Sequence, residues 1–299
     1  MTTPGWTPED YGAVTVLRAA NGGGYPYGNS LLVRGTAATL LVDPSLALVG
    51  GGVPGADAVL VSHAHEDHLV GVAGLAAPVH VHEADAAAVR SSEVLLAGYG
   101  LPANAAAAFG ETLAADFHVG SRPDAVGVPD GHVFDLGDRT ATVVHLPGHT
   151  AGHSGLLVEP DGFFFVADID LTSFGPFYGD VGSSLEGFER SIATCAGIEA
   201  RWYGTYHQKG VVEGVAEFRG RLDAYRDVLV RRDAALVEFL SEPRTLADVV
   251  DHRFVYRPHV DEPYVPTVEA RTAEQHLARL VHRGAVAETE PGRFRAVAG

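Results

Sequence analysis

The strongest constraint in this sequence is a hexapeptide with three histidines and two acidic residues, His63-Ala64-His65-Glu66-Asp67-His68. It follows directly after the apolar segment Val59 to Ser62, which has the length of a buried strand. Alternate residues of an extended chain point the same way, so His63 and His65 can face one metal ion. The following turn can present Asp67 and His68 to a second ion, and imidazole together with carboxylate suits Zn²⁺, Fe or Mn. The pattern therefore predicts a metal site at the end of a strand.

Three further candidate ligands follow other predicted strands. His149 lies in the segment Pro147-Gly148-His149-Thr150-Ala151-Gly152-His153, Asp168 follows an apolar strand, and so does His207. Loops at one edge of a rigid sheet are the usual place for a functional site, so we expect these side chains to meet the hexapeptide there. The predicted site then has enough ligands for two ions.

Short apolar runs of strand length, separated by turn residues, occupy two regions of the chain. The predicted strands are 14–17, 30–33, 39–42, 59–62 and 79–82 in the first region, 131–136, 140–146, 154–158 and 163–167 in the second, and 202–205 beyond them. Glu159-Pro160-Asp161-Gly162 predicts a hairpin between two of these strands. Two helices are expected in the Ala-rich segment 84–116, and further helices at 185–195 and 215–240. The pattern is that of an α/β protein with two half-domains.

The last part of the chain is predicted to be a separate small domain, residues 231–299, after a large domain of residues 1–230. Its expected elements are short helices at 236–240, 246–250 and 273–281 and a strand pair at 285–288 and 293–297, an arrangement that resembles a winged helix. From Asp233 onward this part has 8 arginines against 11 acidic residues, which is the wrong sign for a DNA-binding domain. We therefore favour a helical cap on the sheet domain or a contact in a homodimer.

The whole chain carries a formal charge of −17, from 21 basic and 38 acidic residues. Such a surface repels phosphate backbones and anionic membranes, so neither nucleic acid nor a membrane is expected as a partner. A single cysteine, Cys195, excludes an internal disulfide and a cysteine-cluster metal site. The acidic N-terminal segment has no signal-peptide pattern, which predicts a soluble cytoplasmic protein.

Motif by motif, residues 12–215 resemble the metallo-β-lactamase superfamily, and more narrowly its glyoxalase-II-like hydrolases. The resemblance rests on H-x-H-x-D-H, then P-G-H-T-x-G-H, then an Asp after an apolar strand, then a late His. It implies an αββα sandwich, here with a small helical, winged-helix-like domain at the C-terminus, and it implies that Asp43 orients a ligand histidine. By the same resemblance His63, His65 and His149 bind one ion, Asp67, His68 and His207 bind the other, and Asp168 bridges both.

Two bridged divalent ions, most simply Zn²⁺, can hold a water molecule and lower its pKa toward about 7. The predicted reaction is therefore hydrolysis of an ester, thioester or lactone bond in a small molecule. Asp67 is expected to accept or relay the proton, His153 to support a ligand, and Tyr178 and Tyr206 to hydrogen-bond the substrate. Asp168 stands where the best-known β-lactamase branches have cysteine, which disfavours antibiotic hydrolysis. The aromatic loop 170–179 lacks the basic residues with which glyoxalase II holds glutathione.

Two other functions fit the same motifs. One is an iron-dependent oxidoreductase that resembles the persulfide dioxygenases of the superfamily, with one ion held by His63, His149 and Asp168. The other is an endoribonuclease-type phosphodiesterase, which the acidic charge of the chain disfavours. The identity and number of the bound metal ions distinguish the oxidoreductase from the hydrolases.

Overall fold

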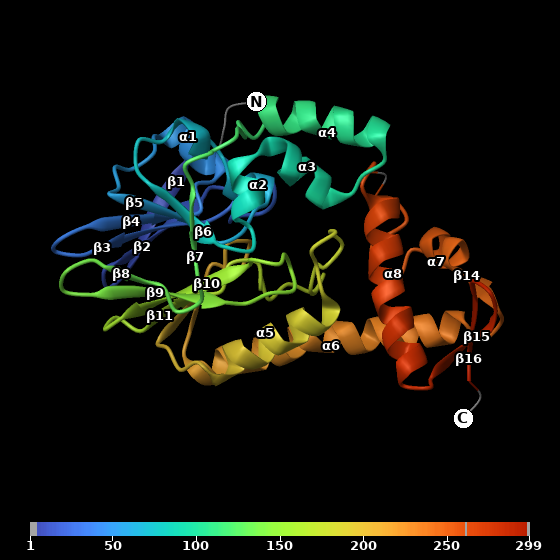
Figure 1. Cartoon of the computed structure of the whole chain (residues 1–299). Coiled ribbons are helices and arrows are strands. Elements are labelled where there is room, and N and C mark those ends of the chain that lie inside the picture. The colour runs from blue at the N-terminus through green and yellow to red at the C-terminus, as the bar shows by residue number, and fades with distance from the viewer. Residues whose placement is uncertain (1–4, 261, 298–299) are drawn as a thin grey trace.

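The computed structural model describes residues 5–260 and 262–297, and its larger part consists of two β-sheets stacked face to face (Figure 1). The first sheet has the strand order β1-β2-β3-β4-β5-β6-β7, with the bounds Trp6–Tyr11, Val14–Ala19, Ser30–Arg34, Thr39–Val42, Ala58–Val61, Val79–His82 and Val126–Val128. The second has the order β13-β12-β11-β10-β9-β8, with the bounds Val211–Glu213, Trp202–Gly204, Phe163–Phe165, Ser154–Glu159, Thr140–His145 and Val133–Asp135. The strands β4 to β7 run parallel, so their carboxyl ends meet at one edge of the sheet.

Helices cover the outer face of each sheet, which completes four layers (Figure 1). The first sheet is covered by α1 (Leu46–Gly51), α2 (Ala86–Arg90), α3 (Ser92–Tyr99) and α4 (Ala103–Ala115). The second sheet is covered by α5 (Leu185–Gly197) and the first half of α6 (Val215–Phe239). The arrangement is the expected αββα sandwich.

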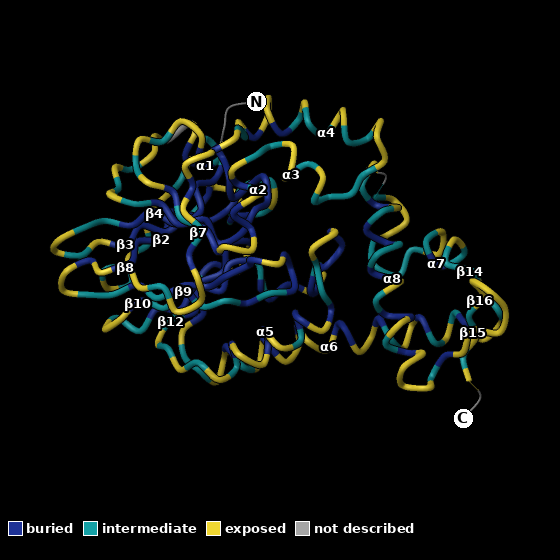
Figure 2. Tube along the Cα trace, viewed as in Figure 1, coloured by how far each residue is buried: buried dark blue, intermediate teal, exposed yellow. Residues whose placement is uncertain are grey.

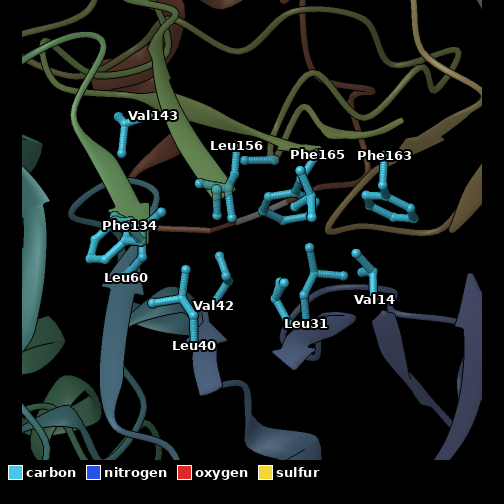
Figure 3. Packing of buried hydrophobic residues seen from close by; sticks show 14 of the residues in the cluster. Val14, Leu31, Leu40, Val42, Leu60, Phe134, Val143, Leu156, Phe163 and Phe165 are labelled. Atoms are coloured by element: carbon cyan, nitrogen blue, oxygen red, sulfur yellow. The ribbon is translucent and has the colours of Figure 1, made fainter. Parts of the chain in front are cut away.

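Alternation of side chains along the strands builds these layers. Val14, Leu31 and Val42 of the first sheet pack against Leu156 and Phe165 of the second (Figure 3). Their chain neighbours on the opposite strand faces are also buried, but against the helices. Because both faces are covered, central strands such as β4, β5 and β11 are mostly apolar, and they lie in the dark interior of Figure 2.

The predicted strands and the hairpin between β10 and β11 are present, with shifts of a few residues at their ends. Sequence reasoning missed β1, β7 and β13, which are all edge strands of their sheets, and it also missed the short α1. An edge strand leaves one side to solvent and carries more polar side chains, which hides its pattern. Two helices were expected over 84–116, but the segment forms three, because Ser91 ends α2 and its hydroxyl caps α3.

The C-terminal part begins on α6, which continues without a break beyond the sheets (Figure 1). After it come α7 (Leu246–His252), α8 (Val265–His282) and a small sheet with the order β14-β16-β15 and the bounds Arg244–Thr245, Arg293–Ala296 and Val286–Glu290. The prediction of a separate helix over 236–240 is wrong, because these residues complete α6, and α8 is longer than predicted. The expected boundary between residues 230 and 231 falls inside α6. The division into two domains and the winged-helix assignment stay predictions.

None of the helices in the described part of the chain is long and apolar enough to cross a membrane.

A buried chain of hydrogen bonds joins α6 and α8 to the loop that contains Tyr178. Arg232 donates to the carbonyl oxygen of Pro176 at 2.6 Å and to the Tyr178 hydroxyl at 2.9 Å. That hydroxyl lies 2.7 Å from Nε2 of His276, and Nδ1 of the same ring lies 2.6 Å from the Asp233 carboxylate. Because Arg232 occupies the hydroxyl oxygen, the hydroxyl proton is free to be donated to a neutral His276. Burial favours this uncharged imidazole and outweighs the nearby Asp233 carboxylate, which favours the charged form.

We expect the burial of His276 to make the protein less stable in mild acid. Burial lowers the pKa of His276, whereas in the unfolded chain the ring keeps its ordinary value of 6.5. The unfolded state therefore binds the proton at a higher pH, and the stabilisation is complete above that value and is lost as the pH falls below it. Thermal melts at about pH 7.5 and about pH 5.5 test this. His276→Gln should lose less stability between them than the wild type, and equal losses would contradict the assignment.

Candidate metal centre

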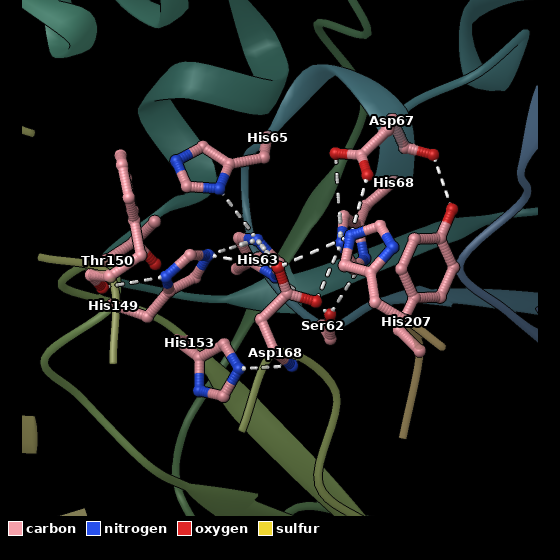
Figure 4. A network of polar contacts seen from close by, with 12 residues as sticks. Ser62, His63, His65, Asp67, His68, His149, Thr150, His153, Asp168 and His207 are labelled. Carbon is pink, nitrogen blue, oxygen red and sulfur yellow. Dashed lines mark hydrogen bonds and ion pairs between the residues drawn. The ribbon is translucent and has the colours of Figure 1, made fainter. Parts of the chain in front are cut away.

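The seven predicted ligands lie together where strands of both sheets end (Figure 4). The hexapeptide follows β5, His149 follows β9, Asp168 follows β11 and His207 follows β12. A backbone hydrogen bond of 2.9 Å from the Ser154 amide to the Ser62 carbonyl joins the two sheets at this edge. The site is therefore built on the rigid part of the sandwich.

The first group of ligands consists of His63, His65, His149 and Asp168, with ligand atoms that all lie within 4.8 Å of one another. Nε2 of His63 lies 2.9 Å from Nδ1 of His65 and 3.1 Å from Nε2 of His149. All three histidines are buried. Their nitrogens thus converge on one point, as expected for a shared metal ion.

The second group consists of Asp67, His68 and His207. Nε2 of His207 lies 3.0 Å from the Asp67 carboxylate, and Nε2 of His68 lies 3.9 Å from it. Asp168 connects the two groups, because its Oδ1 lies 3.1 Å from Nε2 of His68 and its Oδ2 lies 3.3 Å from Nε2 of His149. One carboxylate therefore faces both groups.

The residues present fit two divalent cations. Three buried atoms that point into the site, Asp67 Oδ2, His68 Nε2 and Asp168 Oδ1, make no hydrogen bond of good geometry, although Asp67 Oδ2 lies 3.0 Å from His207 Nε2 and Asp168 Oδ1 lies 3.1 Å from His68 Nε2. Such atoms are rare in folded proteins, because burying a polar atom without a partner is costly. His149 and His207 use Nδ1 to contact backbone carbonyls, which leaves the Nε2 lone pair directed into the site. Imidazole and carboxylate ligands are those that Zn²⁺, Fe and Mn accept.

The charges around the two ligand groups also favour a cation between them. Burial lowers the pKa of His68, but the nearby carboxylates of Asp168, Asp67 and Asp43 outweigh this and raise it well above its usual value. Burial raises the pKa of Asp168, but His68 and His207 outweigh burial and hold it well below its usual range. Asp168 is therefore ionised at neutral pH and ready to bind cations.

Asp43 and His153, which were predicted to support metal ligands, each contact one of these ligands in the structure. The Asp43 carboxylate accepts a hydrogen bond from the Ser62 amide at 2.6 Å and lies 2.9 Å from Nδ1 of His68. The backbone amide of Asp168 donates to Nε2 of His153 at 3.1 Å, and burial lowers the pKa of His153 to about 3. Asp43 thus fixes the orientation of His68, and a neutral His153 holds the backbone at Asp168.

Two other buried carboxylates were missed by sequence reasoning. Asp85 accepts hydrogen bonds from the Ala64 amide at 3.0 Å, the Thr150 hydroxyl at 2.6 Å and the Gly152 amide at 2.7 Å. It thereby ties the hexapeptide to the loop of His149. Asp180 lies 2.5 Å from Nε2 of His65. Neither carboxylate belongs to a recognisable motif, so only the fold brings them to the site.

Neither tyrosine predicted to bind substrate is available for it. Tyr178 is 1% exposed, and its hydroxyl is occupied by His276 and Arg232. Tyr206 is 0% exposed, its ring stacks on His68 with centroids 3.7 Å apart, and its hydroxyl donates to the Asp67 carbonyl at 2.5 Å. We therefore assign Tyr178 to the packing of α8 and Tyr206 to holding the hexapeptide, and propose neither as a substrate contact.

A cavity of about 270 Å³ opens onto the metal ligands. Its floor contains ligands of both groups, and its walls are rich in aromatic side chains. The lining residues are Tyr25, His65, Glu66, Asp67, Tyr99, Leu101, Phe109, His149, Asp168, Asp170, Phe174, Phe177, Asp180, His207, Tyr256, Tyr264 and Val268. Three of them come from the C-terminal part of the chain, which therefore contributes to the site.

Comparison with known sequences agrees with this geometry. The family model described as the metallo-β-lactamase superfamily matches residues 23–207, which include every proposed ligand. No curated protein sequence matches the chain significantly. The narrower resemblance to glyoxalase II stays a prediction.

Solved structures share the fold. A metallo-β-lactamase family protein from Thermus thermophilus has 22% identity and a TM-score of 0.72, with 95% of this chain and 99% of that chain covered. A β-lactamase domain protein from Burkholderia ambifaria has 19% identity and a TM-score of 0.69, with 97% and 93% covered. A metallo-β-lactamase from Elizabethkingia meningoseptica has 14% identity and a TM-score of 0.55, with 77% and 93% covered. Since the family model spans more than half of the sequence, the chain belongs to the metallo-β-lactamase superfamily, whose members are generally metallohydrolases.

Proposed function

We propose that this protein is a dinuclear metallohydrolase that cleaves an ester, thioester or lactone bond in a small molecule. The observation that carries the proposal is the position of Asp168, whose two carboxylate oxygens face two different groups of ligands. A carboxylate with an oxygen for each of two cations can hold both at close range, where they would otherwise repel each other.

Two bound divalent ions would supply an acidified water as nucleophile and a Lewis acid that polarises the scissile carbonyl. The chain itself supplies proton transfer and positioning. Asp67 lines the cavity, and although burial raises its pKa, His68 and His207 outweigh this and keep it ionised, so that it can accept a proton and pass it to the leaving group. The hydrogen bond from the Tyr206 hydroxyl to the backbone carbonyl of Asp67 fixes the main chain that carries this carboxylate.

The second group of ligands favours this function over the mononuclear oxidoreductase. A single iron held by His63, His149 and Asp168 leaves Asp67, His68 and His207 without a role, although these residues are buried and converge. The endoribonuclease alternative has less support, because none of the described residues that line the cavity is a lysine or an arginine that could hold a phosphate backbone.

Metal analysis followed by a substrate panel tests the proposal. Protein produced without added zinc should contain about two ions per chain, and it should hydrolyse at least one of a set of aryl esters, thioesters and lactones. A chelator should abolish this activity, and added Zn²⁺ or Mn²⁺ should restore it. A single iron per chain with consumption of dioxygen and a persulfide would instead support the oxidoreductase, and cleavage of RNA alone would support the phosphodiesterase.

A further inference from the structure

We propose that the substrate is an uncharged ester, thioester or lactone with a bulky apolar acyl group, and that Tyr256 and Tyr264 of the C-terminal part select it. This inference rests on the proposed hydrolase function and deepens it. It follows from three features of the cavity: where its walls come from, how the C-terminal wall is fixed, and which charges the walls carry.

The walls come from three separate parts of the chain and are mainly apolar. Tyr25, Tyr99, Leu101 and Phe109 belong to the N-terminal half, and Phe174 and Phe177 to the loop after Asp168. Tyr256, Tyr264 and Val268 close the remaining side. The rings of Phe174 and Tyr256 are 5.4 Å apart, and those of Tyr256 and Tyr264 are 6.1 Å apart. The aromatic surface is therefore continuous from the metal-site loop to the C-terminal part.

The C-terminal wall is held firmly in position. The Glu269 carboxylate accepts hydrogen bonds from the backbone amides of Val255 at 3.2 Å and Tyr256 at 2.7 Å, which fixes the loop before α8. Arg271 on α8 donates to the Tyr99 carbonyl at 2.7 Å and so attaches the helix to the opposite wall. Gly179 allows the close approach, because a Cβ there would lie 2.5 Å from the side chain of Val268. A wall fixed in this way can discriminate by shape.

The charge of the walls opposes anionic groups. Apart from the metal ligands, the charged residues among the described lining are Glu66, Asp170 and Asp180, with no lysine or arginine. These carboxylates have partners within the protein, since Tyr25 and Tyr99 donate to Glu66, Thr172 donates to Asp170 and Asp180 contacts His65. On the walls, away from the ions that the two ligand groups would hold, a phosphate or carboxylate tail would lie near these groups without a side-chain cation to offset its negative charge. Apolar contacts remain as the means of binding the acyl group.

A matched pair of esters tests the charge preference in the metal-loaded protein. The compounds 4-nitrophenyl pentanoate and 4-nitrophenyl hemiglutarate share the leaving group and a five-carbon acyl chain, but the second ends in a carboxylate. We expect kcat/KM to be at least about tenfold higher for the neutral ester. Tyr264→Arg should narrow this ratio by about fivefold or more, because it adds a cation to the wall. Val281→Arg is the control, since it adds the same charge at an exposed position near the other end of α8.

A second comparison tests the two tyrosines. Tyr256→Ala and Tyr264→Ala should lower kcat/KM for the pentanoate ester at least about fivefold more than they lower kcat/KM for 4-nitrophenyl acetate, because the longer acyl group makes more contact with the aromatic wall. Metal content should stay at the wild-type level. Calorimetry with 4-phenylbutanamide, an uncharged probe that is not an ester, should show weaker binding to both variants by a similar factor. This readout does not depend on turnover.

The outcomes separate the two proposals. A metal-loaded protein that hydrolyses the acetate ester but shows no preference between the matched pair, or variants that treat all esters like the wild type, would overturn the inference alone. A protein that holds two ions and hydrolyses no ester, thioester or lactone would overturn the proposed function and the inference with it. If Tyr256→Ala fails to fold, the matched pair measured on the wild type and on Tyr264→Arg still decides the question.

Discussion

Asp168→Ala should lower the bound metal from about two ions per chain toward one and reduce hydrolysis by at least about two orders of magnitude. The Asp168 carboxylate lies between the two ligand groups, 3.1 Å from Nε2 of His68 and 3.3 Å from Nε2 of His149. Without it, two close cations lose the shared negative charge that offsets their repulsion, so the second ion binds weakly. Metal analysis after dialysis and steady-state kinetics on the best ester of the panel measure both effects.

His82→Ala is the matched control for this experiment. His82 lies on β6, and its ring stacks on that of His145 with centroids 3.8 Å apart. It belongs to neither ligand group. We expect metal content and hydrolysis to stay close to the wild type. Two tightly held ions in Asp168→Ala would show that this carboxylate does not bridge, and they would contradict the mechanism.

Asp85→Ala should lower the free energy of unfolding by about 3 to 5 kcal/mol. The side chain is 5% exposed and accepts hydrogen bonds from three groups, which are the amides of Ala64 and Gly152 and the hydroxyl of Thr150. Alanine leaves these donors buried without an acceptor, and each hydrogen bond to a charged group is worth about 1.5 to 3 kcal/mol. Because Asp85 also joins the two loops that carry the first ligand group, the affinity for the first ion should fall as well.

Urea unfolding of the metal-free protein separates the stability effect from the metal effect, since bound metal stabilises the folded state in its own right. Asp227→Ala removes the same charge from an exposed position on α6 and should change the free energy of unfolding by less than about 0.5 kcal/mol. A loss below about 1 kcal/mol in Asp85→Ala would show that water replaces the carboxylate as acceptor, and the structural role assigned to it would then be wrong.

Four of the metal ligands, His63, His149, Asp168 and His207, could be predicted from the sequence because each follows a short strand, and the other three lie in the hexapeptide that begins at His63. The strands before His63 and Asp168 are buried and apolar, and they are visible in the sequence as the runs Val59 to Val61 and Phe163 to Phe165. The edge strands β1, β7 and β13 were missed for the complementary reason, since partial exposure interrupts their apolar pattern.

The supporting residues depend on contacts between segments that are distant in the chain. Asp180 reaches His65 across 115 residues, and nothing in the sequence around Asp180 indicates this partner. For Tyr178 the sequence instead predicted a substrate contact that the structure does not show. A tyrosine in the loop after a metal ligand was expected to face the substrate, but Arg232 and His276 draw its hydroxyl toward the C-terminal part. Side-chain direction within a loop follows from the packing around it, which the local sequence does not contain.

The origin of the cavity walls has an evolutionary consequence. The proposed metal ligands lie within residues 63–207, whereas part of the cavity wall beside them comes from Tyr256, Tyr264 and Val268. If these residues select the substrate as proposed, mutations in the C-terminal part would diversify substrate preference while the metal ligands stay constant. Chimaeras that exchange the C-terminal part between relatives would change the cavity wall and leave the metal ligands unchanged. Such a graft must retain Arg232, because its contacts with the Pro176 carbonyl and the Tyr178 hydroxyl support the loop between the two parts.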